Sequence, residues 1–137
     1  MERANATHEY HDEPRQKVEM FNAAYKAWMM SLQKQLPEMH QEFDDILDRL
    51  YVADAHDVGY PMNVFQWYTG PYISLMQASD AAFFDHIGKD SAGKSMPVQF
   101  KDAFLSQLSE LDRTRAWATL RYLMQLTAQV YPTYRLE

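Results

Sequence analysis

Residues 108–131 contain neither glycine nor proline, and this stretch constrains the fold more than any other. Five small or apolar side chains, spaced four, three, four and three residues apart, lie on one helical stripe: Ala116, Leu120, Leu123, Thr127 and Val130. Three bulkier side chains lie one position further round and widen the stripe: Trp117, Met124 and Tyr131. A stripe of this width is typical of a helix that packs against neighbours on more than one side. Ser109 can cap the start of the helix, and Pro132 ends it.

Two stretches in the first half show the same periodicity. Asp12 precedes Glu13 and Pro14, a favourable helix start, and Pro37 ends that helix. Its apolar residues recur every three or four positions: Val18, Phe21, Tyr25, Trp28, Leu32 and Leu36, with Met29 beside them. A second helix is expected over residues 37–52, with an inner face of Met39, Phe43, Ile46, Leu47 and Leu50.

The middle of the chain predicts shorter helices. Asn63 can cap a third helix, which Gly70 and Pro71 must break. Helical spacing resumes near Tyr72, and further helices are expected over residues 80–88 and 99–108. No segment predicts a strand, so we expect an all-α fold: an irregular single-domain helical bundle of five to seven helices over residues 12–135, with the C-terminal long helix central. Residues 1–11 are expected to form a flexible N-terminal segment, and residues 136–137 a cloning remnant.

Composition excludes several function classes. The chain has 137 residues, a net charge of −6 and no cysteine, so disulfides and thiol nucleophiles are excluded. Because phosphate affinity depends mainly on Lys and Arg, the acidic balance argues against general nucleic-acid binding. No apolar stretch reaches the roughly 18 residues of a transmembrane helix, and the polar N-terminus predicts no signal peptide. We expect a cytoplasmic protein that needs no cofactor.

The loop expected around residues 88–98 matches the P-loop pattern. Gly88 and Gly93 are followed by Lys94 and Ser95, which in a P-loop reach the terminal phosphates and a magnesium ion. A P-loop follows a buried strand and opens into a long helix. Here the preceding residues have helical spacing, and Pro97 would interrupt a helix that began at Lys94. A solvated loop is therefore the preferred interpretation, with phosphate binding as the alternative.

Two groups of histidines and acids are candidate metal ligands. His8 and His11 would share one face of a helix, and Asp54 lies near His56 in a predicted turn. Two histidines without a fixed third ligand bind a metal weakly, and acids before glycine and proline are common in turns. Metal binding therefore stays an alternative.

An aromatic cluster surrounds the Gly70–Pro71 break. One helical face cannot bury all of its members, namely Tyr60, Phe65, Trp67, Tyr68 and Tyr72. Either other helices wrap this segment, or some rings form a partner-binding surface, for which Tyr60 and Trp67 are the first candidates. The second predicted helix adds an acidic outer face that includes Glu42 and Asp45. This face is interpreted as a solvated surface or as a docking patch for a basic partner.

Three sequence features follow one another in order along the chain. They are Leu36-Pro37-Glu38, a middle segment from Asp80 to Phe84 with Met96-Pro97 before Phe100, and a closing helix with Trp117, Leu120, Tyr122, Leu123 and Leu126. Over about residues 20–131 the chain is similar to short uncharacterised helical proteins of large DNA viruses of algae and protists. The resemblance implies a helical fold and a viral, cytosolic setting, in host cytoplasm or virion.

These observations favour a small non-enzymatic interaction or structural protein. It would bind another protein, or itself, through an aromatic or acidic helical surface. The alternative is a protein that binds a phosphate group, a nucleotide or a metal ion, through the loop from Gly88 to Ser95 or through the histidine and acid groups.

Overall fold

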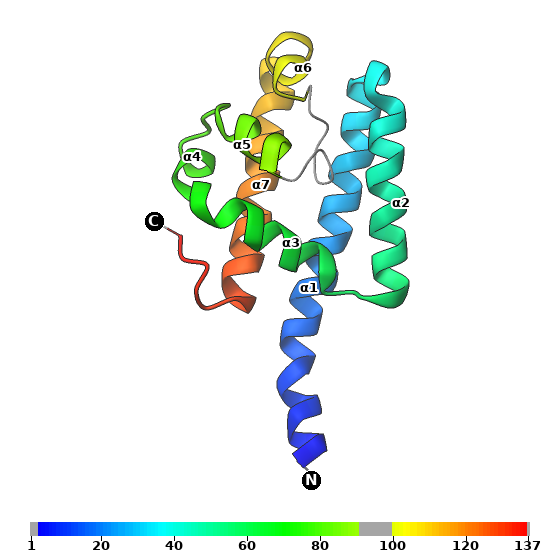
Figure 1. The fold of residues 1–137 in the computed structure, drawn as a ribbon, viewed down its shortest axis with the longest axis vertical. Helices are drawn as coiled ribbons and strands as arrows, with labels where there is room; N and C mark the ends of the chain where they lie inside the picture. Colours follow the sequence, from blue (N-terminus) through cyan, green and yellow to red (C-terminus); the bar gives the residue numbers. More distant parts are fainter. Residues whose placement is uncertain (1–2, 91–99, 137) are drawn as a thin grey trace.

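The computed structural model describes the backbone of residues 3–90 and 100–136, and the side chains of residues 14–86 and 100–136. Within these ranges the chain is helical, without a strand, as the sequence predicts. The described residues form seven α-helices, and two short 3-10 turns, η1 and η2, lie between some of them (Figure 1). In chain order the elements are α1 (Arg3–Gln35), η1 (Pro37–Met39), α2 (His40–His56), α3 (Tyr60–Thr69), η2 (Gly70–Tyr72), α4 (Ile73–Gln77), α5 (Phe83–Asp90), α6 (Phe100–Gln107) and α7 (Glu110–Val130).

The three long helices carry most of the core. Helix α1 lies between α2 and α7, so the central position expected for the C-terminal helix belongs to α1 (Figure 1). All of the residues predicted on the α1 stripe are buried, as is the predicted inner face of α2. On α7, Ala116, Leu120, Leu123 and Thr127 are also buried, whereas Val130 is half-buried. A buried stripe on each helix leaves one continuous core, because each apolar face meets a neighbour.

Helix α1 begins at Arg3, nine residues before the predicted start at Asp12. Pro14 therefore lies inside the helix, where its ring removes one backbone hydrogen bond. The first turns extend beyond the ends of the other helices (Figure 1). Among the described side chains of α1, which begin at Pro14, the first buried one is Val18.

Helix α3 begins at Tyr60 and not at Asn63, which was the predicted cap. Pro61 occupies the first turn, where its missing N–H costs nothing, and the Asn63 N–H already bonds to the Gly59 carbonyl at 3.0 Å. Gly70 and Pro71 do break the helix, through the turn η2, before α4 begins at Ile73. Helix α3 crosses in front of α1 near the C-terminal end of α2 (Figure 1).

Aromatic rings join α5, α6 and α7. Phe84 packs against Phe100, Phe104 and Trp117 with centroid separations of 4.8, 4.9 and 5.2 Å. Lys101 and Asp85 add an ion pair of 2.8 Å between α6 and α5. Both helices are short, so packing against these rings stabilises them more than their own backbone bonds do.

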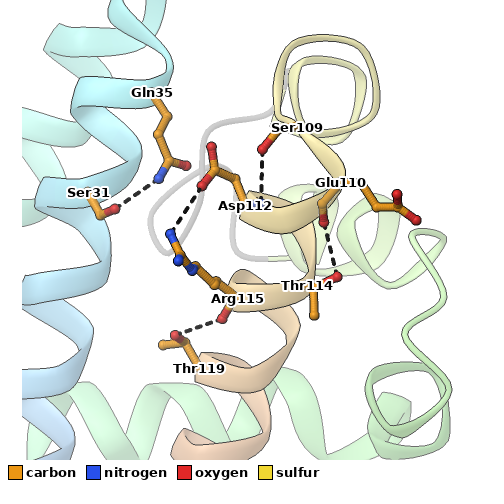
Figure 2. A network of polar contacts seen from close by, with 8 residues as sticks. All are labelled: Ser31, Gln35, Ser109, Glu110, Asp112, Thr114, Arg115 and Thr119. Carbon is orange, nitrogen blue, oxygen red and sulfur yellow. Dashed lines mark hydrogen bonds and ion pairs between the residues drawn. The ribbon is translucent and has the colours of Figure 1, made fainter.

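The N-terminus of α7 has the predicted cap. The Ser109 hydroxyl accepts a hydrogen bond of 3.1 Å from the Asp112 N–H, as Figure 2 shows. Arg115 lies one turn further along, with its guanidinium 4.0 Å from the Asp112 carboxylate. These side chains lie on the side of α7 that faces the C-terminal turns of α1, near Ser31 and Gln35 (Figure 2).

Candidate functional site

A groove between α2 and α3 gathers most of the predicted aromatic cluster; we call it the aromatic groove. Its volume is about 280 Å³. Ten residues from three helices line it: Tyr25 of α1, Ile46, Arg49 and Leu50 of α2, and Tyr60, Pro61, Asn63, Val64, Trp67 and Tyr68 of α3. The buried members Ile46, Leu50 and Pro61 make its floor apolar.

The two most exposed rings of the groove come from α3. Trp67 is 72% exposed and Tyr60 is 54% exposed, which confirms the expectation that these two lie outside the core. Helix periodicity explains the division, because residues 60, 64, 67 and 68 share one face of α3, while Met62, Phe65 and Thr69 share the opposite, buried face. Large exposed rings beside an apolar hollow are typical of interface anchors.

The other two members of the predicted cluster lie elsewhere. Phe65 is buried and packs edge-on against Phe21, with centroids 5.2 Å apart, so it belongs to the core and not to a partner surface. Tyr72 is half-buried and stacks on the His86 ring at 4.2 Å, outside the groove lining. Arg49 and Tyr25 line the groove but were not predicted, since nothing in their local sequence sets them apart from ordinary surface and core residues.

Acidic side chains surround the α2 wall of the groove. Glu42, Asp45 and Arg49 are three and four positions apart, so they lie on one stripe of the helix. Val52 continues the stripe and is 60% exposed. Asp45 accepts a hydrogen bond of 3.0 Å from Gln41, but neither Glu42 nor Asp45 forms an ion pair with another described residue. The two predicted acids therefore lie next to the aromatic groove without lining it.

Glu42 belongs instead to a second hollow, between η1, α2 and α6. This hollow has a volume of about 330 Å³, and three carboxylates line it together with uncharged residues: Glu38, Glu42 and Asp102, then Met39, Ala103, Ser106 and Gln107. No basic side chain lines it among the described residues. The α2 stripe therefore connects an acidic hollow near its start with the aromatic groove near its middle.

Asp54, a candidate metal ligand, has partners within the chain. Its carboxylate pairs with the Lys26 ammonium group and accepts a hydrogen bond of 2.9 Å from the Asn22 amide. His56 is exposed at the end of α2, and among the residues described no group of three acids or histidines could hold a metal ion. The side chains of His8 and His11 lie outside the described residues.

The P-loop pattern lies mostly outside the described residues too. Gly93, Lys94 and Ser95 fall in the stretch that the structure does not describe. Gly88 lies inside helix α5, so the residues before it form a helix and not the strand that precedes a P-loop.

A third hollow lies between α1 and α7 and has a volume of about 490 Å³. Alanines make up much of its lining: Ala24 and Ala27 of α1, with Ala116 and Ala118 of α7. Trp28 also lines it, and its indole N–H has no hydrogen-bond partner among the described residues. Tyr122, at 39% exposure, is the one large exposed ring on this side among the described residues. This hollow is a weaker candidate because it lacks the exposed aromatic rim of the α2–α3 groove.

Comparisons with protein-family models, with curated proteins and with solved structures found no significant match. In the part of the chain that the structure describes, no helix is both long and apolar enough to cross a bilayer.

Proposed function

We propose that this chain is a non-enzymatic interaction protein that binds a segment of another protein in the aromatic groove. The observation that carries the proposal is the exposure of Trp67 and Tyr60, at 72% and 54%, at the edge of an apolar hollow. Covering these rings on binding removes apolar surface from water, which is the main source of free energy in protein association.

The lining of the groove suits binding better than chemistry. Its ten described residues include no Asp, Glu, His, Lys, Cys or Ser, the side chains that most often act as nucleophiles or proton carriers. A volume of about 280 Å³ is also at the lower end of small-molecule pockets, so it fits one or two side chains of a larger partner.

We also propose the setting in which this binding occurs. The resemblance to small viral proteins implies the cytoplasm of a host cell, or a virion, so the partner would be a host or viral protein. A second copy of the chain is the other candidate partner, because exposed aromatic surfaces also support self-association.

Affinity capture from the source cells tests the proposal. Wild-type protein is compared with Trp67→Ala and with Tyr60→Ala, and Tyr122→Ala serves as the matched control because it removes an exposed ring from α7. Circular dichroism verifies that all variants fold. We expect the same captured protein with wild type and control, and a loss with both α3 variants, because truncated anchors typically cost about 2 kcal/mol or more.

Two results would contradict the proposal. A partner retained by both α3 variants but lost with Tyr122→Ala would assign binding to the α1–α7 hollow. A strictly monomeric protein that captures nothing under these conditions would leave the groove without a binding role. Size-exclusion chromatography of the same variants shows whether the partner is a second copy.

A further inference from the structure

We propose that the partner of the aromatic groove is a basic segment, which places an apolar or aromatic side chain in the groove and its Lys or Arg side chains along α2 toward Glu42. This inference rests on the proposed function and adds the chemistry of the partner. Three properties of the described residues support it: the charge of α2, the position of the acids relative to the groove, and the faces of the exposed rings.

Helix α2 is strongly acidic. Residues 40–56 contain five acids, namely Glu42, Asp44, Asp45, Asp48 and Asp54, against one strong base, Arg49. Asp54 pairs with Lys26, and Asp44 accepts a hydrogen bond of 2.6 Å from Gln33. Glu42, Asp45 and Asp48 form no ion pair with a described residue, so their charge is available to a partner. Complementary charge steers a basic segment toward this helix and repels an acidic one.

The position of the acids defines a direction along α2. Glu42 and Arg49 are seven residues apart on one stripe, which corresponds to about 10 Å along the helix axis. If one side chain of the partner lies at the Arg49 end, the residues next to it in the partner segment would lie along Asp45. They would then reach the hollow lined by Glu38, Glu42 and Asp102. An extended segment covers this distance with about three residues, and a helical one with about seven.

Arg49 decides which end of the segment is basic. Its guanidinium is the one positive charge among the described residues that line the groove, so a basic side chain is disfavoured there. A guanidinium plane also stacks well on aromatic rings, which favours an aromatic anchor at this end. Basic side chains are then favoured on the Glu42 side, away from Arg49.

Exposed rings strengthen the preference for cations. The chain already has one such contact, in which the Lys26 ammonium lies 4.9 Å from the centre of the Tyr51 ring. Tyr60 and Trp67 lie on the α3 wall of the groove, opposite the α2 wall that carries Arg49. The negative π faces of these exposed rings attract Lys or Arg side chains that flank the anchored side chain outside the groove. Aromatic rings next to carboxylates therefore favour a basic segment over a neutral proline-rich one, which would need the rings alone.

A displayed library of random 12-residue peptides, panned against the full chain, tests the inference. We expect enriched peptides to combine one aromatic or large aliphatic residue with two or more Lys or Arg. Binding of a synthetic copy of the most enriched peptide is then measured by fluorescence anisotropy. Trp67→Ala should weaken it by about thirtyfold or more. Each of Glu42→Gln and Asp45→Asn should weaken it by about two- to fivefold, and added salt should reduce the effect.

Asp44→Asn is the matched control, because Asp44 lies on the same helix but contacts Gln33 and His40 on α1 and α2. We expect little change in peptide affinity for this variant. Peptides that are acidic, neutral or proline-rich, and that still need Trp67, would overturn the inference and leave the proposed function standing. Peptides that bind wild type and Trp67→Ala equally would overturn both, as would panning that enriches no peptide.

Discussion

Tyr134 anchors the C-terminal tail, and its removal should have an effect that changes sign with pH. The side chain is buried, and its hydroxyl lies 2.7 Å from the Thr69 hydroxyl of α3. Thr69 already donates its proton to the Phe65 carbonyl at 2.6 Å, so Tyr134 must be the donor in the second bond. Tyr134→Phe removes this donor but leaves the Thr69 proton satisfied. We expect a cost of about 1 kcal/mol at neutral pH.

Alkaline pH should remove that cost. Burial raises the pKa of Tyr134 to about 12, because a buried phenolate would lose its hydration. The ordinary value of about 10 applies in the unfolded chain, which therefore loses this proton first as the pH rises. The stabilisation is complete below about pH 10 and is lost as the pH rises toward about 12, by up to about 3 kcal/mol. Phenylalanine has no such proton, so the two stabilities should cross near about pH 11, where the loss reaches about 1.4 kcal/mol.

Urea denaturation of both proteins, followed by circular dichroism, measures this difference between about pH 7 and about pH 11. Burial also raises the pKa of Tyr131, but that residue is present in both proteins, so its contribution cancels. A deficit of the variant that stays constant over the whole range would refute the reasoning. It would mean that Tyr134 ionises equally easily in the folded and unfolded chains.

Two further predictions concern the core and the polar contacts of α2. Leu123→Ala should destabilise the fold by about 3 kcal/mol, because the side chain is fully buried. Leu111→Ala, at an exposed position, should change the free energy of unfolding by less than about 0.5 kcal/mol. Equal effects of the two substitutions in urea denaturation would contradict this core assignment. Asp54→Ala should lower the free energy of unfolding by about 2 kcal/mol, because Lys26 loses its ion pair and the Asn22 amide loses a charged acceptor. Asp48→Ala, the surface control, should be nearly neutral. Thermal melting with and without zinc tests Asp54 as a metal ligand: a zinc-dependent rise in Tm that Asp54→Ala abolishes would restore the metal alternative.

The buried faces of the three long helices could be predicted from the amino-acid sequence. The stripes of α1 and α2 and most of the α7 stripe are local patterns, and an apolar face repeated every three or four residues has to be covered in any stable fold. The Gly70–Pro71 break and the Ser109 cap were equally predictable, because each depends on the backbone chemistry of a few neighbouring residues.

Which helix faces meet could not be predicted from the sequence, because it depends on contacts between distant parts of the chain. Helix α3 is apolar on several sides, so the sequence singled out Trp67 as exposed but kept Phe65 in the same candidate surface. Packing against α1 buries Phe65 and leaves Trp67 exposed. Arg49 likewise lines the groove only because α3 packs beside α2 in the folded chain. A helical pattern records how wide an apolar face is, but not which neighbour covers it. The central position of α1, and the aromatic groove beside the acids of α2, follow from contacts between residues far apart in the chain.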